Sequence, residues 1–317
     1  MTAKPLTSVV TPVYNGARYL PECIESVLSQ TYSRWEYIIV NNLSTDETLE
    51  IALHYAERDS RIRVITNNEF LSSLQNHNAA LHQISPDSKY CKIVHADDWI
   101  FPECLEKMVK VAEENPSVGL VGAYALEGTK IRYDGLPYPS TVVPGWQMCR
   151  SRLLGGPYVF GTPTTLLIRS EIIKGSGEYY GDYLHADLEA CYRVLQDHDF
   201  GFVHQVLTFS RVHPEQQSSI ARKYNYYLPA AIDVLKKFGP VYLTDAEYET
   251  VFKNKINKYY IYLAKSLLAG MGRDFWNYHR NEFKRMGLKF NPARFPRALA
   301  IAAAILIARF FRDKLQP

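Results

Sequence analysis

Residues 90–98 read YCKIVHADD, so a short apolar run ends directly in two neighbouring carboxylates, Asp97 and Asp98. The run has the length and composition of a buried strand. Adjacent carboxylates at the end of such a strand repel each other, and a bound cation removes that penalty. Oxygen ligands of this kind suit magnesium or manganese. In the alternative interpretation, Asp98 caps a helix that Pro102 opens and that runs to about Glu114.

The chain before this run alternates between strand and helix patterns. Strands are predicted at 8–13, 35–40 and 62–65, and helices at 20–28, 48–57 and 72–84. Ser44 and Glu47 fit a capping box in front of the second helix. Short connections between strands and helices predict right-handed βαβ units, and therefore an α/β fold with a parallel sheet.

Polar residues follow the predicted strands where the strands end. They are Tyr14-Asn15, Asn41-Asn42 and Asp97-Asp98. Ligands of open α/β sheets bind beyond the carboxyl ends of the strands. We therefore expect these three pairs to converge on one site.

Three blocks carry a family resemblance, namely residues 10–16 (VTPVYNG), 38–48 (IIVNNLSTDET) and 95–98 (HADD). Together they resemble the inverting family-2 glycosyltransferases of the GT-A fold, over about residues 6 to 215. The resemblance implies a Rossmann-like mixed, mostly parallel sheet flanked by helices. It also implies a nucleotide diphosphate-sugar donor, a divalent metal (manganese or magnesium), and inversion at the anomeric carbon.

The resemblance also assigns the donor side of the site. Thr11, Pro12, Val13 and Tyr14 match the segment that lies against the base. Asn42 matches a usually acidic position that accepts a hydrogen bond from the base, and Asp97 and Asp98 match the carboxylates that meet ribose and metal. Gln75 stands where many relatives have an arginine, so Asn76 is expected to replace it by hydrogen bonding.

Two later residues match positions that act on the reaction itself. Asp187 matches the general base, with Glu189 as the second candidate, although an acidic residue at the start of a helix can also serve as a cap. His213 resembles a late histidine that reaches the pyrophosphate or the metal, and an ordinary loop histidine is the alternative. His95 stands where an aspartate is common, and it would contribute either a nitrogen ligand or a hydrogen bond.

The later part of the chain predicts further organisation. Residues 128–157 are rich in Gly, Pro and Tyr and predict a functional loop. We expect a catalytic domain at 1–222 and a helical region at 223–317. Residues 298–308 are uncharged and lie between basic residues, which suits either a packed helix or one that lies on a membrane surface through residues 296–317.

Composition limits the remaining possibilities. The 317 residues are 47% hydrophobic and 22% charged, which excludes global disorder. A net charge of +3 without a long basic run gives no reason to expect nucleic acid. The five cysteines form no Cys-x-x-Cys pair and suit a reducing compartment, so we expect a cytoplasmic protein, with peripheral membrane binding as an option.

Two functions remain open from the sequence. In the first, the protein transfers a sugar to a saccharide or lipid-linked acceptor. In the alternative, it is a catalytically impaired nucleotide-sugar binder in a glycan-assembly complex. The presence of Asp97, Asp98 and Asp187 together favours the transferase, because a protein without activity has no chemical need for both metal carboxylates and a base.

Overall fold

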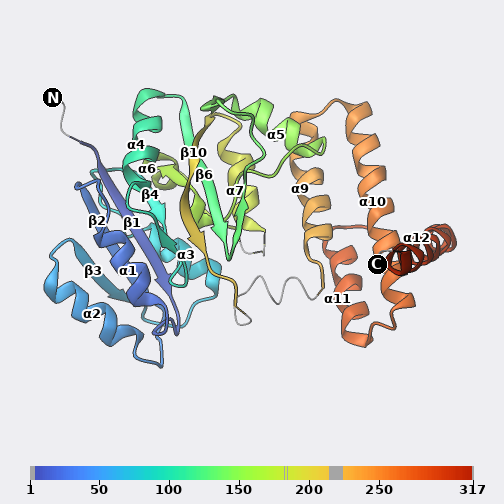
Figure 1. The fold of residues 1–317 in the computed structure, drawn as a ribbon, viewed down its shortest axis with the longest axis horizontal. Helices are drawn as coiled ribbons and strands as arrows, with labels where there is room; N and C mark the ends of the chain where they lie inside the picture. Colours follow the sequence, from blue (N-terminus) through green and yellow to red (C-terminus); the bar gives the residue numbers. More distant parts are fainter. Residues whose placement is uncertain (1–3, 182, 184, 214–223, 316–317) are drawn as a thin grey trace. The chain divides into compact units, whose positions relative to one another are not determined.

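The computed structural model describes residues 4–181, 183, 185–213 and 224–315 (Figure 1). The chain divides into a first unit that ends at Val212 and a second unit that begins at His213. The boundary expected at residue 222 lies outside the described residues. Each unit has its own hydrophobic core, so the two are described separately.

The first unit is built on one sheet with the strand order β3-β2-β1-β4-β9-β6-β10-β5, to which β7 adds beside β6 and β8 beside β10. The strands are β1 Leu6–Val13, β2 Trp35–Asn41, β3 Ile62–Thr66, β4 Ser88–Ile93, β5 Trp99–Ile100, β6 Val118–Glu127, β7 Lys130–Arg132, β8 Val142–Val143, β9 Leu167–Arg169 and β10 Asp199–Ser210.

One internal strand of the sheet, β9, runs against both of its neighbours. β3, β2, β1 and β4 pair in parallel, with Val10 opposite both Ile38 and Ile93. β9 runs antiparallel to β4 and to β6, and β6 is again parallel to β10. The predicted α/β fold with a mixed sheet is confirmed, and its parallel strands are the buried apolar runs that such a sheet requires.

Helices flank the sheet, as Figure 1 shows. They are α1 Leu20–Leu28, α2 Thr48–Arg58, α3 Ser73–Leu81, α4 Cys104–Glu114, α5 Gly145–Leu153, α6 Ser170–Lys174 and α7 Ala186–Val194, together with a 3-10 turn at Pro163–Thr165. The apolar face predicted for α1 is buried, with Leu20, Cys23, Ile24 and Val27 at 0% exposure. This face packs into the first unit's core because its residues recur at helical spacing.

Two local predictions are wrong. Ser44 does not cap α2, since its hydroxyl accepts from the Asn15 amide, and Asp46 accepts from the amide and hydroxyl of Thr48 instead. Residues 128–157 are not one loop, because they contain β7, β8 and α5, whose basic residues Arg150 and Arg152 suit a helix C-terminus.

The second unit consists of helices. They are α9 Tyr227–Tyr242, α10 Asp245–Leu268, α11 Arg273–Arg285, a 3-10 turn at Pro292–Arg294 and α12 Phe295–Leu315. α10 begins with a capping box in which the Thr244 hydroxyl accepts from the Glu247 amide. Within the part of the chain that the structure describes, no helix combines the length and apolarity needed to cross a bilayer.

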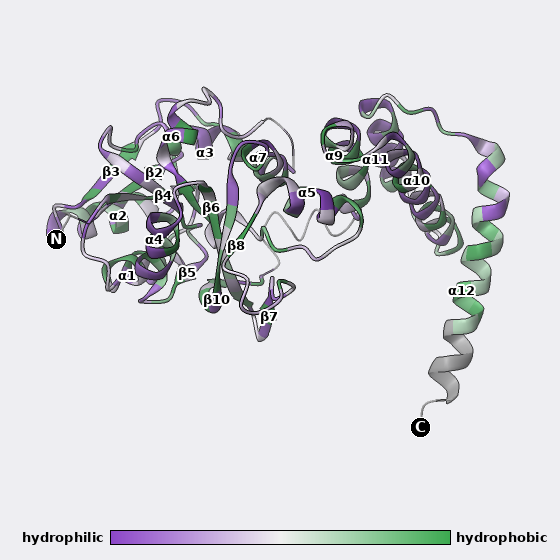
Figure 2. Cartoon of the chain, turned by 90° about the horizontal axis from the view of Figure 1, so that it is seen from above, coloured by the Kyte–Doolittle hydropathy of each residue, from purple (hydrophilic) through white to green (hydrophobic). Residues whose placement is uncertain are grey.

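α12 is apolar along much of its described length, as Figure 2 shows. Its first half packs in the second unit's core, where Ala298 and Ala302 are 4% and 0% exposed. Further along, Ile305, Leu306 and Ile307 are 41%, 41% and 57% exposed. The same helix therefore has a packed segment and an exposed apolar segment.

Candidate functional site

The polar pairs predicted to converge lie at one edge of the sheet. β1, β2 and β4 are adjacent and parallel, so Tyr14-Asn15, Asn41-Asn42 and the HADD segment all follow the same ends of neighbouring strands. The loops after β1 and β2 are joined by hydrogen bonds, because Asn15 Oδ1 accepts from the Thr45 amide over 2.8 Å. Neighbouring strands thus place polar residues at the same end of the sheet.

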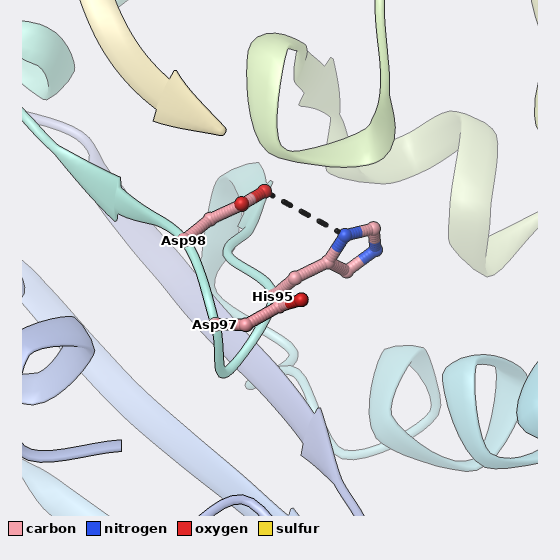
Figure 3. Close-up of side chains that lie close together, drawn as sticks. All are labelled: His95, Asp97 and Asp98. Atoms are coloured by element: carbon pink, nitrogen blue, oxygen red, sulfur yellow. Dashed lines mark ion pairs between the residues drawn. The ribbon is translucent and has the colours of Figure 1, made fainter. Parts of the chain in front are cut away.

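His95, Asp97 and Asp98 form a candidate metal site (Figure 3). One potential ligand atom from each lies within 4.8 Å of the others. His95 Nδ1 is 3.8 Å from Asp98 Oδ2, and the Asp98 side chain is 7% exposed. Two carboxylates and an imidazole are a donor set that fits a divalent metal.

Asp98 is held from several directions. It does not cap α4, whose N-cap is Glu103. Its Oδ1 atom instead accepts from the backbone amide of Arg211 over 3.0 Å. Burial raises the pKa of Asp98 to about 6, His95 opposes the rise, and the nearby Asp97 adds to it. A bound cation would relieve both the burial penalty and the repulsion.

The buried Lys92 helps to fix the segment that carries Asp97 and Asp98. Lys92 is 0% exposed, and its amine donates to the carbonyl oxygens of Thr164 at 2.5 Å and Leu166 at 3.3 Å. The Thr164 hydroxyl in turn accepts from the backbone amide of His95 over 3.1 Å. The polar contacts satisfy the buried amine, whose pKa burial lowers, and they fix the start of the HADD segment.

Asn42 and Asn76 lie in one amide network. Asn67 Nδ2 donates to Asn42 Oδ1 over 2.9 Å and to Asn76 Oδ1 over 2.8 Å. Asn42 also pairs with both backbone groups of Leu71, donating to the carbonyl at 2.8 Å and accepting from the amide at 3.0 Å. Both asparagines are buried, at 2% and 4% exposure. Asn42 thus shapes the loop at 67–71, and its contact with a base stays a prediction.

The segment expected to lie against the base is buried except at its end. Thr11 is 0% exposed, and its hydroxyl donates to the Val94 carbonyl over 2.7 Å. Pro12 and Val13 are also buried. Tyr14 is 48% exposed and meets the ring of Phe70 edge-on, with centroids 4.9 Å apart. Within this segment, the Tyr14 ring is the side chain available to a ligand.

Asp187 lies in the first turn of α7, whose N-cap is His185, so it is not the helix cap. Its Oδ1 accepts from the Leu188 amide over 2.8 Å. Burial raises the pKa of Asp187, and the hydrogen bond from the Leu188 amide opposes that rise. Glu189, the second candidate base, is 7% exposed.

His213 begins the second unit, and its role as a metal ligand stays a prediction. Asn67 and His77 were not predicted from the sequence. A signal existed for His77, because Ser72 and Gln75 form a capping box that starts α3 and places His77 one turn along it.

Comparison with known proteins agrees with this geometry. The model of the family described as Glycosyl transferase family 2 matches residues 8–176. EpsE of Bacillus subtilis, which is named a glycosyltransferase, is 35% identical over 164 residues, covering 49% of this chain and 57% of EpsE. An uncharacterized glycosyltransferase of Rickettsia typhi is 30% identical over 230 residues, covering 69% of this chain and 68% of the relative.

The matched region is shorter than some relatives. It spans 57% of EpsE and 36% of an uncharacterized glycosyltransferase of Haemophilus influenzae, which is 36% identical over 38% of this chain.

Solved structures share the fold. TarS of S. aureus in complex with UDP-GlcNAc has a TM-score of 0.60 at 18% identity, covering 80% of this chain and 72% of that chain. The mannosyltransferase PcManGT of Pyrobaculum calidifontis, in complex with GDP-Man and Mn²⁺, has a TM-score of 0.54 at 14% identity, covering 96% and 87%. With the match to more than half of its sequence, the chain belongs to glycosyl transferase family 2.

Proposed function

We propose that the protein transfers a sugar from a nucleotide diphosphate-sugar to a saccharide or lipid-linked acceptor, with inversion and with a divalent metal. The observation that carries this proposal is the cluster of His95, Asp97 and Asp98 beyond β4, in a chain of this family. The cluster lies at the strand ends where ligands of such sheets bind.

The donor would lie along the edge formed by the loops after β1, β2 and β4. The exposed rings of Tyr14 and Phe70 offer an apolar surface for a flat base, and both are more than 45% exposed. Asn42, Asn67 and Asn76 form the polar wall beside it. TarS and PcManGT contain UDP-GlcNAc and GDP-Man, so a diphosphate donor suits this fold, while the base is a matter for experiment.

Asp97 and Asp98 would hold the metal, and His95 lies beside them. When bound, a divalent ion stabilises the negative charge that develops on a departing diphosphate. Burial of Asp98 at 7% exposure keeps this carboxylate in a low-dielectric setting, where its attraction for a cation is strong.

Asp187 would act as the general base. A raised pKa makes the Asp187 carboxylate a stronger base toward the hydroxyl group of the sugar acceptor. The proton affinity of the carboxylate then lies closer to that of the alkoxide. A single base and a direct displacement produce inversion.

The acceptor is proposed to be a glycan or its lipid-linked precursor. A relative at 34% identity carries the name of a teichuronic acid biosynthesis glycosyltransferase, which is consistent with polysaccharide assembly. Ile305, Leu306 and Ile307 form an exposed apolar segment, and Arg294 and Arg297 precede it. Apolar side chains with flanking cations suit the surface of an anionic membrane, so we propose a cytoplasmic protein that binds the membrane peripherally.

The first experiment is a melting-temperature panel with nucleoside diphosphates, each with manganese and with chelator. A ligand at 100 times its dissociation constant that binds only the folded state adds about 2.7 kcal/mol of stability. We expect one diphosphate to stabilise the protein in manganese and to lose most of this effect in chelator. If no diphosphate stabilises the protein under either condition, the donor site is impaired. The proposed transfer reaction then fails, and so does the nucleotide-sugar-binding alternative.

A further inference from the structure

Two histidines lie side by side at the candidate metal site. His77 Nε2 is 3.1 Å from His95 Nε2, which is hydrogen-bonding distance. The other ring nitrogen of His77, Nδ1, is 2.7 Å from the backbone carbonyl oxygen of Ser73, one turn earlier in α3. The helix therefore fixes the His77 ring, and the ring faces His95.

The proton positions in this chain of contacts follow from donor and acceptor chemistry. A carbonyl oxygen only accepts, so His77 Nδ1 carries a hydrogen. Neutral His77 with its hydrogen on Nδ1 has a free lone pair on Nε2. That lone pair accepts, which requires His95 Nε2 to donate.

The remaining nitrogen of His95 is thereby left to face the carboxylates. With the hydrogen of a neutral imidazole on Nε2, Nδ1 presents a lone pair. It points toward Asp98 Oδ2 at 3.8 Å, as the dashed line in Figure 3 shows. This separation is too long for a direct hydrogen bond. It is within the span of two metal–ligand bonds of about 2 Å each.

We propose that His95 Nδ1 is a nitrogen ligand of the divalent metal and that His77 is the positioning residue that sets the His95 tautomer. This inference rests on the proposed metal-assisted function and deepens it. Metal-bound histidines donate their second ring hydrogen to a neighbouring group, and His77 Nε2 supplies the acceptor here. Because imidazole suits manganese better than magnesium, the site is expected to select manganese.

The direct test is pulsed electron paramagnetic resonance on the full chain with Mn²⁺ and either UDP or GDP. A coordinated imidazole nitrogen produces a ¹⁴N modulation of the Mn²⁺ signal. Labelling the protein with ¹⁵N-histidine is expected to convert this modulation to that of ¹⁵N, which excludes nitrogen from the nucleotide. Wild-type protein is sufficient for this measurement, so it does not depend on a variant that folds.

Variants then assign the nitrogen to one residue. His95→Asp is expected to bind Mn²⁺ with reduced histidine modulation and with less preference for manganese over magnesium. His77→Phe is expected to weaken Mn²⁺ binding by about 10–100-fold, the usual effect of losing such a supporting group. His77→Gln offers an acceptor oxygen to His95 and should restore part of the affinity. The control is His54→Phe, which changes an exposed histidine on α2.

Different failures have different meanings. Bound Mn²⁺ without histidine modulation overturns the inference and leaves the proposed function intact. Modulation of undiminished depth in His95→Asp also overturns it, because another histidine then supplies the whole signal. If Mn²⁺ does not bind with either diphosphate, the inference and the metal-assisted function both fail.

Discussion

The backbone amide of Arg211 donates a hydrogen bond to Asp98 Oδ1 over 3.0 Å, although the two residues are 113 positions apart. Arg211 also donates through Nε to the Asp97 carbonyl over 3.1 Å. The end of β10 therefore holds the two carboxylates of the candidate metal site from outside their own loop. It leaves Asp98 Oδ2 on the side of His95.

Asp98→Asn is expected to abolish stabilisation by manganese and diphosphate while the fold is retained. Asparagine keeps an oxygen for the Arg211 amide but removes the charge that attracts a cation. The measurement is the melting shift with Mn²⁺ and the diphosphate that stabilises the wild type. Asp87→Asn, which removes an exposed carboxylate, is the control. A full shift in Asp98→Asn would remove this residue from the metal site.

Asp187→Asn is expected to lower turnover by about 10²–10⁴-fold, with a much smaller effect on donor affinity. The base acts in the transition state, so donor binding does not depend on it. The measurement combines steady-state transfer with the dissociation constant of the donor. Glu189→Gln is the matched variant, because Glu189 lies in the same helical turn of α7. If Glu189→Gln causes the larger loss, the second candidate is the base.

The pH dependence of transfer should also report Asp187. A base works when deprotonated, so kcat/KM falls as the pH drops through its pKa. Since burial raises the pKa of Asp187, this fall is expected at a higher pH than the value of about 3.9 for a free aspartate would give. The profile of kcat/KM against pH measures it. The residual activity of Asp187→Asn should lack this fall, and an unchanged profile would assign it to another group.

Asn42→Asp tests whether position 42 requires the amide group of asparagine. Aspartate would place a carboxylate oxygen against the Leu71 carbonyl, where Asn42 Nδ2 now donates over 2.8 Å. Loss of that buried contact should cost about 1–3 kcal/mol or more in the free energy of unfolding, measured by urea denaturation. The control is the exposed Asn68→Asp. Unchanged stability would mean that the loop at 67–71 rearranges easily. The same rearrangement would be needed for residue 42 to contact a nucleotide base.

The exposed segment of α12 can be tested without removing the helix. Ile305→Gln, Leu306→Gln and Ile307→Gln combined keep helix-forming residues and leave the buried Ala298 and Ala302 in place. Burying such apolar side chains contributes about 1.5–3 kcal/mol each, so binding to anionic vesicles should weaken at least about tenfold in a sedimentation assay. Leu53→Gln, on α2 at 46% exposure, is the control. Unchanged binding would favour a helix that only packs.

The sequence was sufficient for the parts that depend on periodicity and strand order. β1, α1, β2 and the polar ends of β1, β2 and β4 follow from local pattern, because a buried strand and an amphipathic helix each repeat at their own spacing. Ser44 shows where local pattern fails. It fits a cap by sequence, but Asn15 from another loop binds its hydroxyl.

The residues that support the site could not be predicted from local sequence pattern for the same reason. Thr164 and Lys92 meet only because β9 runs antiparallel beside β4, and no spacing in the sequence encodes that pairing. His77 required knowledge of which way α3 faces. Burial is the main cause of the raised pKa of Asp98, and this burial depends on how the chain folds around the residue, which local pattern does not encode.

The strand order also bears on how the protein is made. β1 to β4 pair with one another and are complete by Ile93, so this half of the sheet can form early on the ribosome. Arg211 emerges on the order of ten seconds later at usual rates of synthesis. Until β10 pairs with β6, Asp98 lacks its distant hydrogen-bond donor. A nascent chain is therefore expected to acquire its metal affinity as one of the last steps of folding the first unit.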